Sequence, residues 1–111
     1  PLMPINITAS GKTLMGINGA RLCTQWSITA EIRDALNIPL VLHGGTGLTD
    51  EQFKKLIALG MRKINIATDI FMAQAGACQG KDIFKNIASS VDAVSTTVQR
   101  YIKLFGSEGK A

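Results

Sequence analysis

An apolar run that ends in a glycine-rich turn constrains this chain more than any other feature. Residues Ile38–Leu42 lead directly into His43–Gly47, and a second apolar run, Lys63–Asp69, follows further along the chain. Each run has the length and composition of a buried strand, and the segment between them has the apolar spacing of an amphipathic helix. We therefore predict a βαβ unit whose two parallel strands open their carboxyl ends on the same side of a sheet.

The polar groups that follow these strands suit an anionic ligand held beside a metal ion. His43 is a potential metal ligand, and the glycines of the turn let backbone N–H groups approach a ligand closely. Asn65 and Thr68 add an amide and a hydroxyl. By the crossover rule we expect His43, the turn, Asn65 and Thr68 within about 10 Å of one another. A phosphate-bearing substrate is the ligand that this arrangement favours.

Each of these residues also has a structural interpretation. His43 is the single histidine of the chain, and a lone histidine after a strand is usually a hydrogen-bonding residue. Asn65 could be a buried amide bonded to a neighbouring strand, because an unsatisfied one costs about 1–3 kcal/mol, or an amide that binds substrate oxygen. The glycines could form an ordinary tight turn. Thr68 and Asp69 are equally compatible with helix capping and with ligand contact.

The remaining elements are predicted from breakers and caps. Residues 1–26 are interrupted by proline and glycine, so we expect an irregular segment with one short strand. Ser27 is predicted to cap a helix that Asn37 terminates, and a strand Leu40–Leu42 follows. Thr49, with Gln52 three residues later, predicts a capping box, in which both side chains satisfy free N–H groups at a helix start. The next strand is placed at Ile64–Ile66.

The tail is helical in character. Asp69 is predicted to cap a helix through about Gln79, and residues 82–106 to form one long amphipathic helix. We expect its apolar stripe to be buried against the chain's own domain, or alternatively to pair subunits. Left without a complete partner surface, the stripe should make the isolated chain self-associate or leave it partly molten. The stripe consists of Phe84, Ile87, Val91, Val94, Val98, Tyr101 and Phe105.

Composition excludes several classes of partner. The net charge is +4, but the cationic residues are scattered and aromatic residues make up only 5%, which disfavours a nucleic-acid surface. The longest wholly apolar run is far shorter than a membrane span, and the start of the chain lacks the pattern of a signal peptide. Cys23 and Cys78 form no metal or disulfide motif, which is typical of reduced thiols in a cytoplasmic protein.

The sequence matches two nucleotide-binding motifs only in part. Gly11-Lys12-Thr13 lacks the earlier glycine of a phosphate-binding P-loop, which this chain replaces with Asn6. Gly45 and Gly47 match the first two glycines of the dinucleotide-binding fingerprint, but Asp50 stands where its last glycine is required. An acidic residue that could bind the ribose is also missing at the required distance.

The residues around both predicted strands resemble one enzyme family. Ile38–Gly47 and Lys63–Thr68 are similar to the corresponding stretches of class II, metal-dependent ketose-bisphosphate aldolases, which include fructose- and tagatose-1,6-bisphosphate aldolases. The spacing from His43 to Asn65 agrees, as does the ending Phe105–Ala111. The resemblance covers residues 27–111, and residues 1–26 show no clear match to the family.

This resemblance implies a fold and a site. Residues 27–111 would be the C-terminal part of an α/β fold, a (β/α)8 TIM barrel, with its last two strands and its closing helices. His43 would be one of three zinc ligands, with another divalent metal or a monovalent cation as alternative ions. Ala67 favours the tagatose type. The residues that would bind the phosphate and the rest of the substrate are Gly44, Gly45, Thr46, Asn65, Ile66, Ala67 and Thr68.

The resemblance also implies what this chain lacks. The family's aspartate base and two further zinc histidines have no counterpart among these 111 residues, so we assign no catalytic residue here. A full barrel takes about 250 residues, and we expect a portion of one that is inactive alone. The hypothesis is a carbon–carbon lyase that cleaves a ketose 1,6-bisphosphate to dihydroxyacetone phosphate and glyceraldehyde 3-phosphate, as a homo-oligomer joined through helical surfaces. The alternative is an inactive remnant that serves as a phosphate-binding or assembly module.

Overall fold

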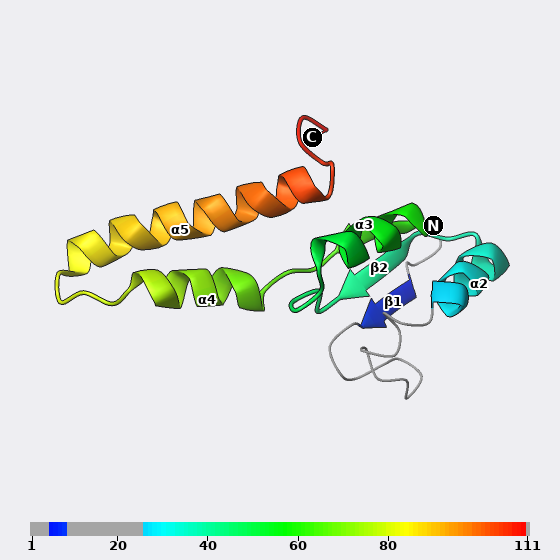
Figure 1. Cartoon of the computed structure of the whole chain (residues 1–111), viewed down its shortest axis with the longest axis horizontal. Coiled ribbons are helices and arrows are strands. Elements are labelled where there is room, and N and C mark those ends of the chain that lie inside the picture. Colours follow the sequence, from blue (N-terminus) through cyan, green and yellow to red (C-terminus); the bar gives the residue numbers. More distant parts are fainter. Residues whose placement is uncertain (1–4, 9–25, 111) are drawn as a thin grey trace. The chain divides into compact units, whose positions relative to one another are not determined.

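The chain forms two compact units, residues 1–66 and 67–111. The computed structural model describes residues 5–8 and 26–110, with the backbone alone for 5–8 and 26–28. The first unit is built from strands and helices, and the second is a pair of helices (Figure 1). Within the described residues, none of the helices combines the length and apolar character that crossing a membrane requires.

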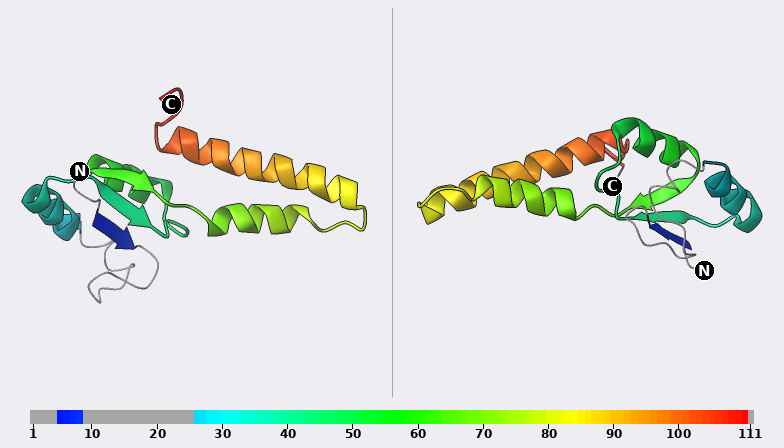
Figure 2. Two further views of the ribbon diagram at one scale, coloured as in Figure 1. Left: turned by 180° about the vertical axis from the view of Figure 1, so that it is seen from behind. Right: turned by 60° about the horizontal axis from the view of Figure 1, so that its bottom comes forward.

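A parallel sheet organises the first unit. Its three strands are β1 (Ile5–Thr8), β2 (Leu40–His43) and β3 (Met61–Ile64), in the order β1-β2-β3. Both pairings are parallel, so β2 is hydrogen-bonded on both sides (Figure 2). The predicted α/β class with parallel strands is confirmed, and the short strand expected within residues 1–26 is β1.

The core lies where β2 meets the helix α3 (Asp50–Ala58). Leu40 and Leu42 are fully buried because β2 is the central strand, and Phe53 and Leu56 of α3 are each 1% exposed. These two residues are three positions apart and therefore share one helix face. Burial of each such side chain stabilises the fold by about 1.5–3 kcal/mol.

The third strand begins earlier than the sequence indicated. A strand was predicted at Ile64–Ile66, whereas β3 runs from Met61 to Ile64, and this prediction is wrong by three positions. The physical reason is Gly60, whose φ of +107° turns the chain directly into the strand after α3 ends. Asn65 therefore lies immediately after the strand and not at its centre.

The helix α2 (Trp26–Leu36) agrees with its predicted end but not with its predicted start. It begins at Trp26, so Ser27 lies in its first turn and does not precede it. Asn37 has a φ of +46°, the left-handed conformation predicted for a helix terminator. Its N–H donates to the carbonyl of Arg33 at 3.1 Å, which closes the last turn.

The second unit pairs α4 (Thr68–Ala77) with α5 (Ile83–Leu104), side by side in Figures 1 and 2. Asp69 was predicted to cap the first of these helices, but the cap is Ala67 and Asp69 lies within the first turn. Its carboxylate instead accepts a hydrogen bond from the hydroxyl of Tyr101, which ties the two helices together. The long helix begins as predicted, with the Asp82 side chain capping two backbone N–H groups.

The expected buried stripe of α5 is buried only at its far end. Tyr101 is buried, but Phe84, Ile87 and Val91 are 81%, 56% and 62% exposed, so the prediction of a continuous buried stripe is wrong for this chain by itself. For Phe84 and Ile87 the reason is length, since α4 has 10 residues and α5 has 22, so the start of α5 extends beyond α4. A contact of 2.8 Å between Cys78 Sγ and Ser90 Oγ marks where α4 stops covering its partner helix.

Candidate functional site

The candidate site starts where β2 ends. Leu40–Leu42 are fixed in the core, and His43 is the first residue of the strand that is only half-buried. Its position at the carboxyl end of a central parallel strand is the one predicted from the sequence. In open α/β sheets this end of the strands is where ligands bind.

The side chain of Asn65 meets His43 at this end of the sheet. The amide Nδ2 of Asn65 lies 3.0 Å from Nδ1 of His43, which is hydrogen-bond distance between residues 22 positions apart. Backbone hydrogen bonds hold both residues in place, because the N–H of Asn65 donates to the carbonyl of Leu42 at 2.9 Å. The predicted proximity of His43 and Asn65 is confirmed.

This contact determines which ring nitrogen of His43 carries the proton. An amide nitrogen can only donate, so Nδ1 accepts and the neutral ring is protonated on Nε2. A metal ion needs a free lone pair on one ring nitrogen. Metal binding at His43 therefore requires Asn65 to leave Nδ1, or to rotate its amide so that the oxygen accepts from Nδ1–H.

The glycine turn is shaped by packing as much as by its backbone. Gly44 and Gly47 have φ values of +65° and +90°, conformations that favour glycine. Gly45 is buried, and a Cβ there would lie 2.8 Å from Ile66 and 2.9 Å from the ring of Phe53. The sequence therefore needs glycine at 45 for space and at 44 and 47 for conformation.

The turn offers fewer backbone donors than expected. The N–H of Gly45 donates to the carbonyl of Asn65 at 3.3 Å, and the N–H of Leu48 donates to the carbonyl of Gly45 at 3.2 Å. Within the described part of the chain, the N–H groups of Thr46 and Gly47 have no backbone acceptor. Any anion bound by the turn would therefore use Thr46 and Gly47 and not Gly45.

The helix that follows the turn is capped as predicted. The Thr49 hydroxyl accepts from the N–H of Gln52 at 3.3 Å, and the Gln52 side chain accepts from the N–H of Thr49 at 2.8 Å. Asp50 and Glu51 stand in the first turn. Because these groups already satisfy the positive end of the helix, α3 itself contributes little to binding an anion.

The other predicted site residues divide between the two units. Ile66 packs against Gly45, in the first unit with His43 and Asn65. Ala67 and Thr68 begin the second unit, as the cap and first residue of α4. The structure thus brings together His43, Gly45, Asn65 and Ile66.

Sequence reasoning missed two residues that shape these regions. The ring of Phe53 limits the space at Gly45, and a residue in a helix gives no sequence signal for contact with a distant turn. Tyr101 lies 32 positions from the Asp69 carboxylate to which it donates. Burial, and then its hydrogen bond to Asp69, raises the pKa of Tyr101 above its ordinary value, so the phenol remains a neutral donor.

The described residues do not complete a metal site. A catalytic zinc ion usually takes three protein ligands, and no group of three histidine, cysteine or carboxylate side chains lies close enough among residues 5–8 and 26–110. His43 is a suitable single ligand. Cys78 is exposed and belongs to the second unit, and Cys23 lies outside the described residues.

Comparison with known proteins identifies similar sequences and similar solved structures. Residues 13–110 match the family model described as class II fructose-bisphosphate aldolase. The match therefore begins within residues 1–26, the segment in which the sequence motifs show no clear resemblance to the family. Over 89 residues the chain is 42% identical to the fructose-bisphosphate aldolase of Geobacillus stearothermophilus, covering 73% of this chain and 31% of that protein. It is 38% identical over 90 residues to the 6-phospho-5-dehydro-2-deoxy-D-gluconate aldolase of Shouchella clausii, covering 74% and 31%.

One of the similar structures is the crystal structure of the YdjI aldolase from Escherichia coli K12. The TM-score is 0.74 at 38% identity, and the match covers 78% of this chain and 34% of that one. The chain therefore spans about a third of the length of the relatives that it matches.

We predict that the ring of His43 is held in one tautomer by Asn65. Nitrogen-15 NMR of the neutral ring should show Nδ1 as the unprotonated and Nε2 as the protonated nitrogen, and the assignment is unambiguous because the chain has one histidine. Asn65→Ala should raise the share of the Nδ1-protonated form, giving a mixture of the two tautomers in which that form is more populated than in the wild type. A wild-type ring that already shows this mixture would contradict the contact.

We also predict that Gly45→Ala destabilises the first unit. The added methyl group must displace Ile66 or the buried ring of Phe53, at a cost of about 1–3 kcal/mol in the free energy of unfolding. Gly76→Ala is the control, because nothing lies within 4 Å of a Cβ there and alanine in a helix should stabilise by about 0.5–1 kcal/mol. Equal effects of both substitutions in urea denaturation would show that Gly45 is not packed as described.

Proposed function

Because the chain belongs to the class II fructose-bisphosphate aldolase family, we propose that it supplies the substrate phosphate site and one zinc ligand of such an aldolase. The substrate class is a phosphorylated ketose, since the relatives include aldolases named for fructose bisphosphate and for 6-phospho-5-dehydro-2-deoxy-D-gluconate. The reaction that we propose is reversible cleavage of a ketose 1,6-bisphosphate to dihydroxyacetone phosphate and glyceraldehyde 3-phosphate.

The observation that carries this proposal is the contact between Asn65 and His43 across two parallel strands. The contact joins an imidazole, which could ligate a metal ion, to an amide, which could bind a substrate oxygen, and both lie beside the glycine turn. The N–H groups of Thr46 and Gly47, which have no backbone acceptor among the described residues, support the proposal as donors that a phosphate could engage.

Different residues would bind different parts of the substrate. The N–H groups of Thr46 and Gly47 would donate to phosphate oxygens, while Gly45 keeps the turn close to the sheet. The Asn65 amide would orient a substrate oxygen, with Ile66, Ala67 and Thr68 continuing the binding surface along the chain. Zinc in such an enzyme polarises the substrate carbonyl. His43 would be one ligand, and the other ligands and the base must come from outside the described residues.

The sheet fits a part of a larger barrel. Three parallel strands with β2 buried between its neighbours have the pattern of a segment of a (β/α)8 barrel, and the TM-score of 0.74 to an aldolase structure supports that assignment. We propose that β2 and β3 are its last two strands and that α4 and α5 are its closing helices.

The proposal predicts where dihydroxyacetone phosphate binds. In an NMR titration of the chain, the backbone amide signals of Gly44–Gly47 should shift and saturate, and Asn65→Ala should weaken binding severalfold, up to about tenfold, the effect of losing one hydrogen bond. Gln99→Ala, which removes an exposed amide from α5, should leave the affinity unchanged. Unshifted turn signals at saturating ligand would overturn the proposed function.

We predict that the chain alone has no measurable aldolase turnover. Loss of an essential base typically costs two to four decades in rate, about 10²–10⁴-fold, and the zinc site is incomplete in the described residues. The assay is cleavage of fructose and tagatose bisphosphates with added zinc, repeated with a chelator. Zinc-dependent cleavage by the purified chain would show that its site is complete.

We further propose that copies of this chain associate through α5. Phe84, Ile87 and Val91 present exposed apolar side chains on one helix, and clustered exposed apolar side chains are typical of protein–protein contact surfaces. Sedimentation velocity should show oligomers, and the double variant Phe84→Lys, Ile87→Lys should sediment as a monomer, while Lys85→Ala should not. A compact wild-type monomer with cooperative unfolding would contradict this association.

A further inference from the structure

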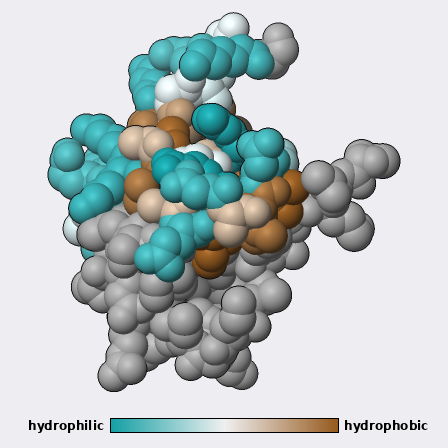
Figure 3. Space-filling model, turned by 90° about the vertical axis from the view of Figure 1, so that its right-hand side faces the viewer, coloured by the Kyte–Doolittle hydropathy of each residue, from teal (hydrophilic) through white to brown (hydrophobic). Residues whose placement is uncertain are grey.

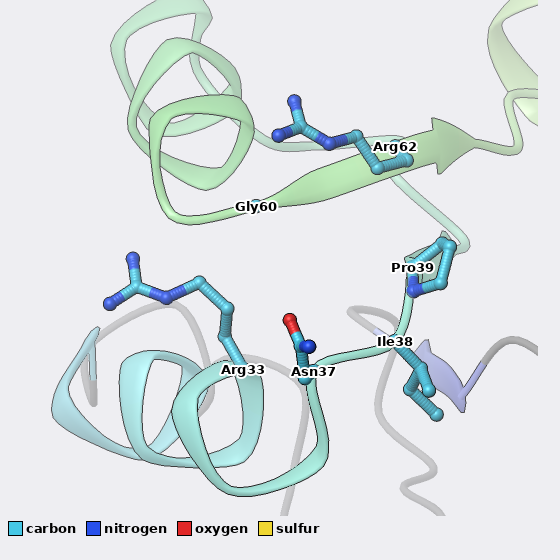
Figure 4. A pocket seen from close by; sticks show the side chains of 6 residues that line it. All are labelled: Arg33, Asn37, Ile38, Pro39, Gly60 and Arg62. Atoms are coloured by element: carbon cyan, nitrogen blue, oxygen red, sulfur yellow. The ribbon is translucent and has the colours of Figure 1, made fainter.

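A cavity of about 320 Å³ lies at the end of the sheet opposite to His43 (Figure 4). It is formed where α2 ends and where β2 and β3 begin, whereas His43 and Asn65 stand where those strands end. With a rise of about 3.3 Å per residue, four-residue strands separate the two ends by roughly 10 Å or more. The described residues that line the cavity are Arg33, Asn37, Ile38, Pro39, Gly60 and Arg62.

Arg62 owes its position in the cavity to an irregularity of the sheet. Leu40 pairs with Met61 and Val41 pairs with Lys63, so Arg62 is an extra residue in β3. An extra residue of this kind bends the strand and redirects a side chain. Within the described part of the chain, no carboxylate lies within ion-pair distance of Arg62.

Arg33 reaches the same cavity from the last turn of α2. Its side chain lies against Gly60, where a Cβ would come within 3.0 Å of Cδ of Arg33. Figure 4 shows Arg33 and Arg62 on either side of Gly60, with both guanidinium groups extending to the same side. One carboxylate oxygen of Asp34 accepts from Nε and lies 2.7 Å from Nη2 of Arg33, which leaves other N–H groups of the guanidinium for a ligand.

The rest of the lining completes a site for a small anionic group. Asn37 contributes an amide that points toward the space between the arginines (Figure 4), and Ile38 and Pro39 add apolar residues to the lining. None of the described lining residues is acidic. Figure 3 looks at this side of the molecule and shows hydrophilic side chains beside a hydrophobic patch.

We propose that this cavity binds the phosphate group of a small phosphorylated molecule. A guanidinium group matches phosphate geometry through parallel N–H donors, two such groups line this cavity, and its volume accommodates a small metabolite. Asp34 competes with the ligand for Arg33. The site is separate from the glycine turn and does not depend on the function proposed for it.

The test is an NMR titration of the full chain with inorganic phosphate, following the backbone amides of Gly60 and Arg62 and the side-chain signals of both arginines. These signals should shift and saturate. Arg62→Gln should weaken phosphate binding at least about tenfold, and Asp34→Asn should strengthen it severalfold by releasing Arg33. The same spectra report whether each variant is folded.

Two matched controls distinguish a specific phosphate site from nonspecific attraction of phosphate by the surface charge. Lys63→Gln removes an exposed cation next to Arg62, and Glu31→Gln removes an exposed acid from the helix that carries Asp34; both should leave the affinity within about twofold. Equal weakening by Arg62→Gln and Lys63→Gln would overturn the proposal. Shifts confined to Gly44–Gly47, with Gly60 and Arg62 unmoved, would overturn it as well.

Glucose 6-phosphate distinguishes the two sources of the phosphate group. Tighter binding of the sugar phosphate than of inorganic phosphate, at the same signals, would support a metabolite that also contacts Ile38 and Pro39. Equal affinities would support a site for free phosphate. If neither ligand shifts the signals of Gly60 and Arg62, the proposed phosphate site is contradicted.

Discussion

The hydrogen bond between the Asn65 amide and the His43 imidazole is the constraint on which the candidate site depends. It joins the ends of two neighbouring strands, and backbone bonds from Asn65 to Leu42 and from Gly45 to Asn65 hold the same junction. Glycine at 45 is required because Ile66 and Phe53 fill the space around it. The core beneath the site, the turn and the polar side chains are therefore one interdependent arrangement.

The same hydrogen bond sets a condition on the chemistry. With Asn65 donating to Nδ1, His43 presents a protonated Nε2, so binding of a metal ion must be coupled to a movement of the amide. In the proposed function Asn65 is also the residue that contacts substrate. Metal binding and substrate contact would then each require Asn65 to give up its present bond to Nδ1 of His43, which links the two events without a separate switch.

The sequence predicted those parts of the fold that local patterns determine. The buried strand before His43, the capping box of Thr49 and Gln52 and the left-handed Asn37 all follow from adjacent residues, and the structure has them. The bounds of β3 were misplaced because its start depends on the conformation of Gly60. The extra residue Arg62 could not be predicted, since it arises from register with another strand.

Long-range contacts account for the other differences. Asp69 looks like a helix cap in the sequence, but Tyr101, far along the chain, engages its carboxylate. The apolar stripe of α5 has the sequence pattern of a buried helix face, yet α4 is too short to cover the start of α5. Periodicity identifies an apolar face but carries no information on what the face packs against.

The two ends of the sheet would bind anions by different means. At the carboxyl ends, the donors are backbone N–H groups and one amide, whereas at the amino ends they are two guanidinium groups, one of them partly neutralised by Asp34. Guanidinium groups provide charge that salt screens, and backbone groups provide fixed geometry. The two sites should therefore differ in their dependence on ionic strength.

The central claim is that Asn65 and His43 are joined directly across β2 and β3. The most direct measurement is the scalar coupling between nitrogen-15 nuclei through the hydrogen bond, from Nδ2 of Asn65 to Nδ1 of His43. The account predicts a resolved coupling between these two nuclei in the neutral form of the ring. Sharp, assigned signals for both nitrogens with no coupling between them would contradict it.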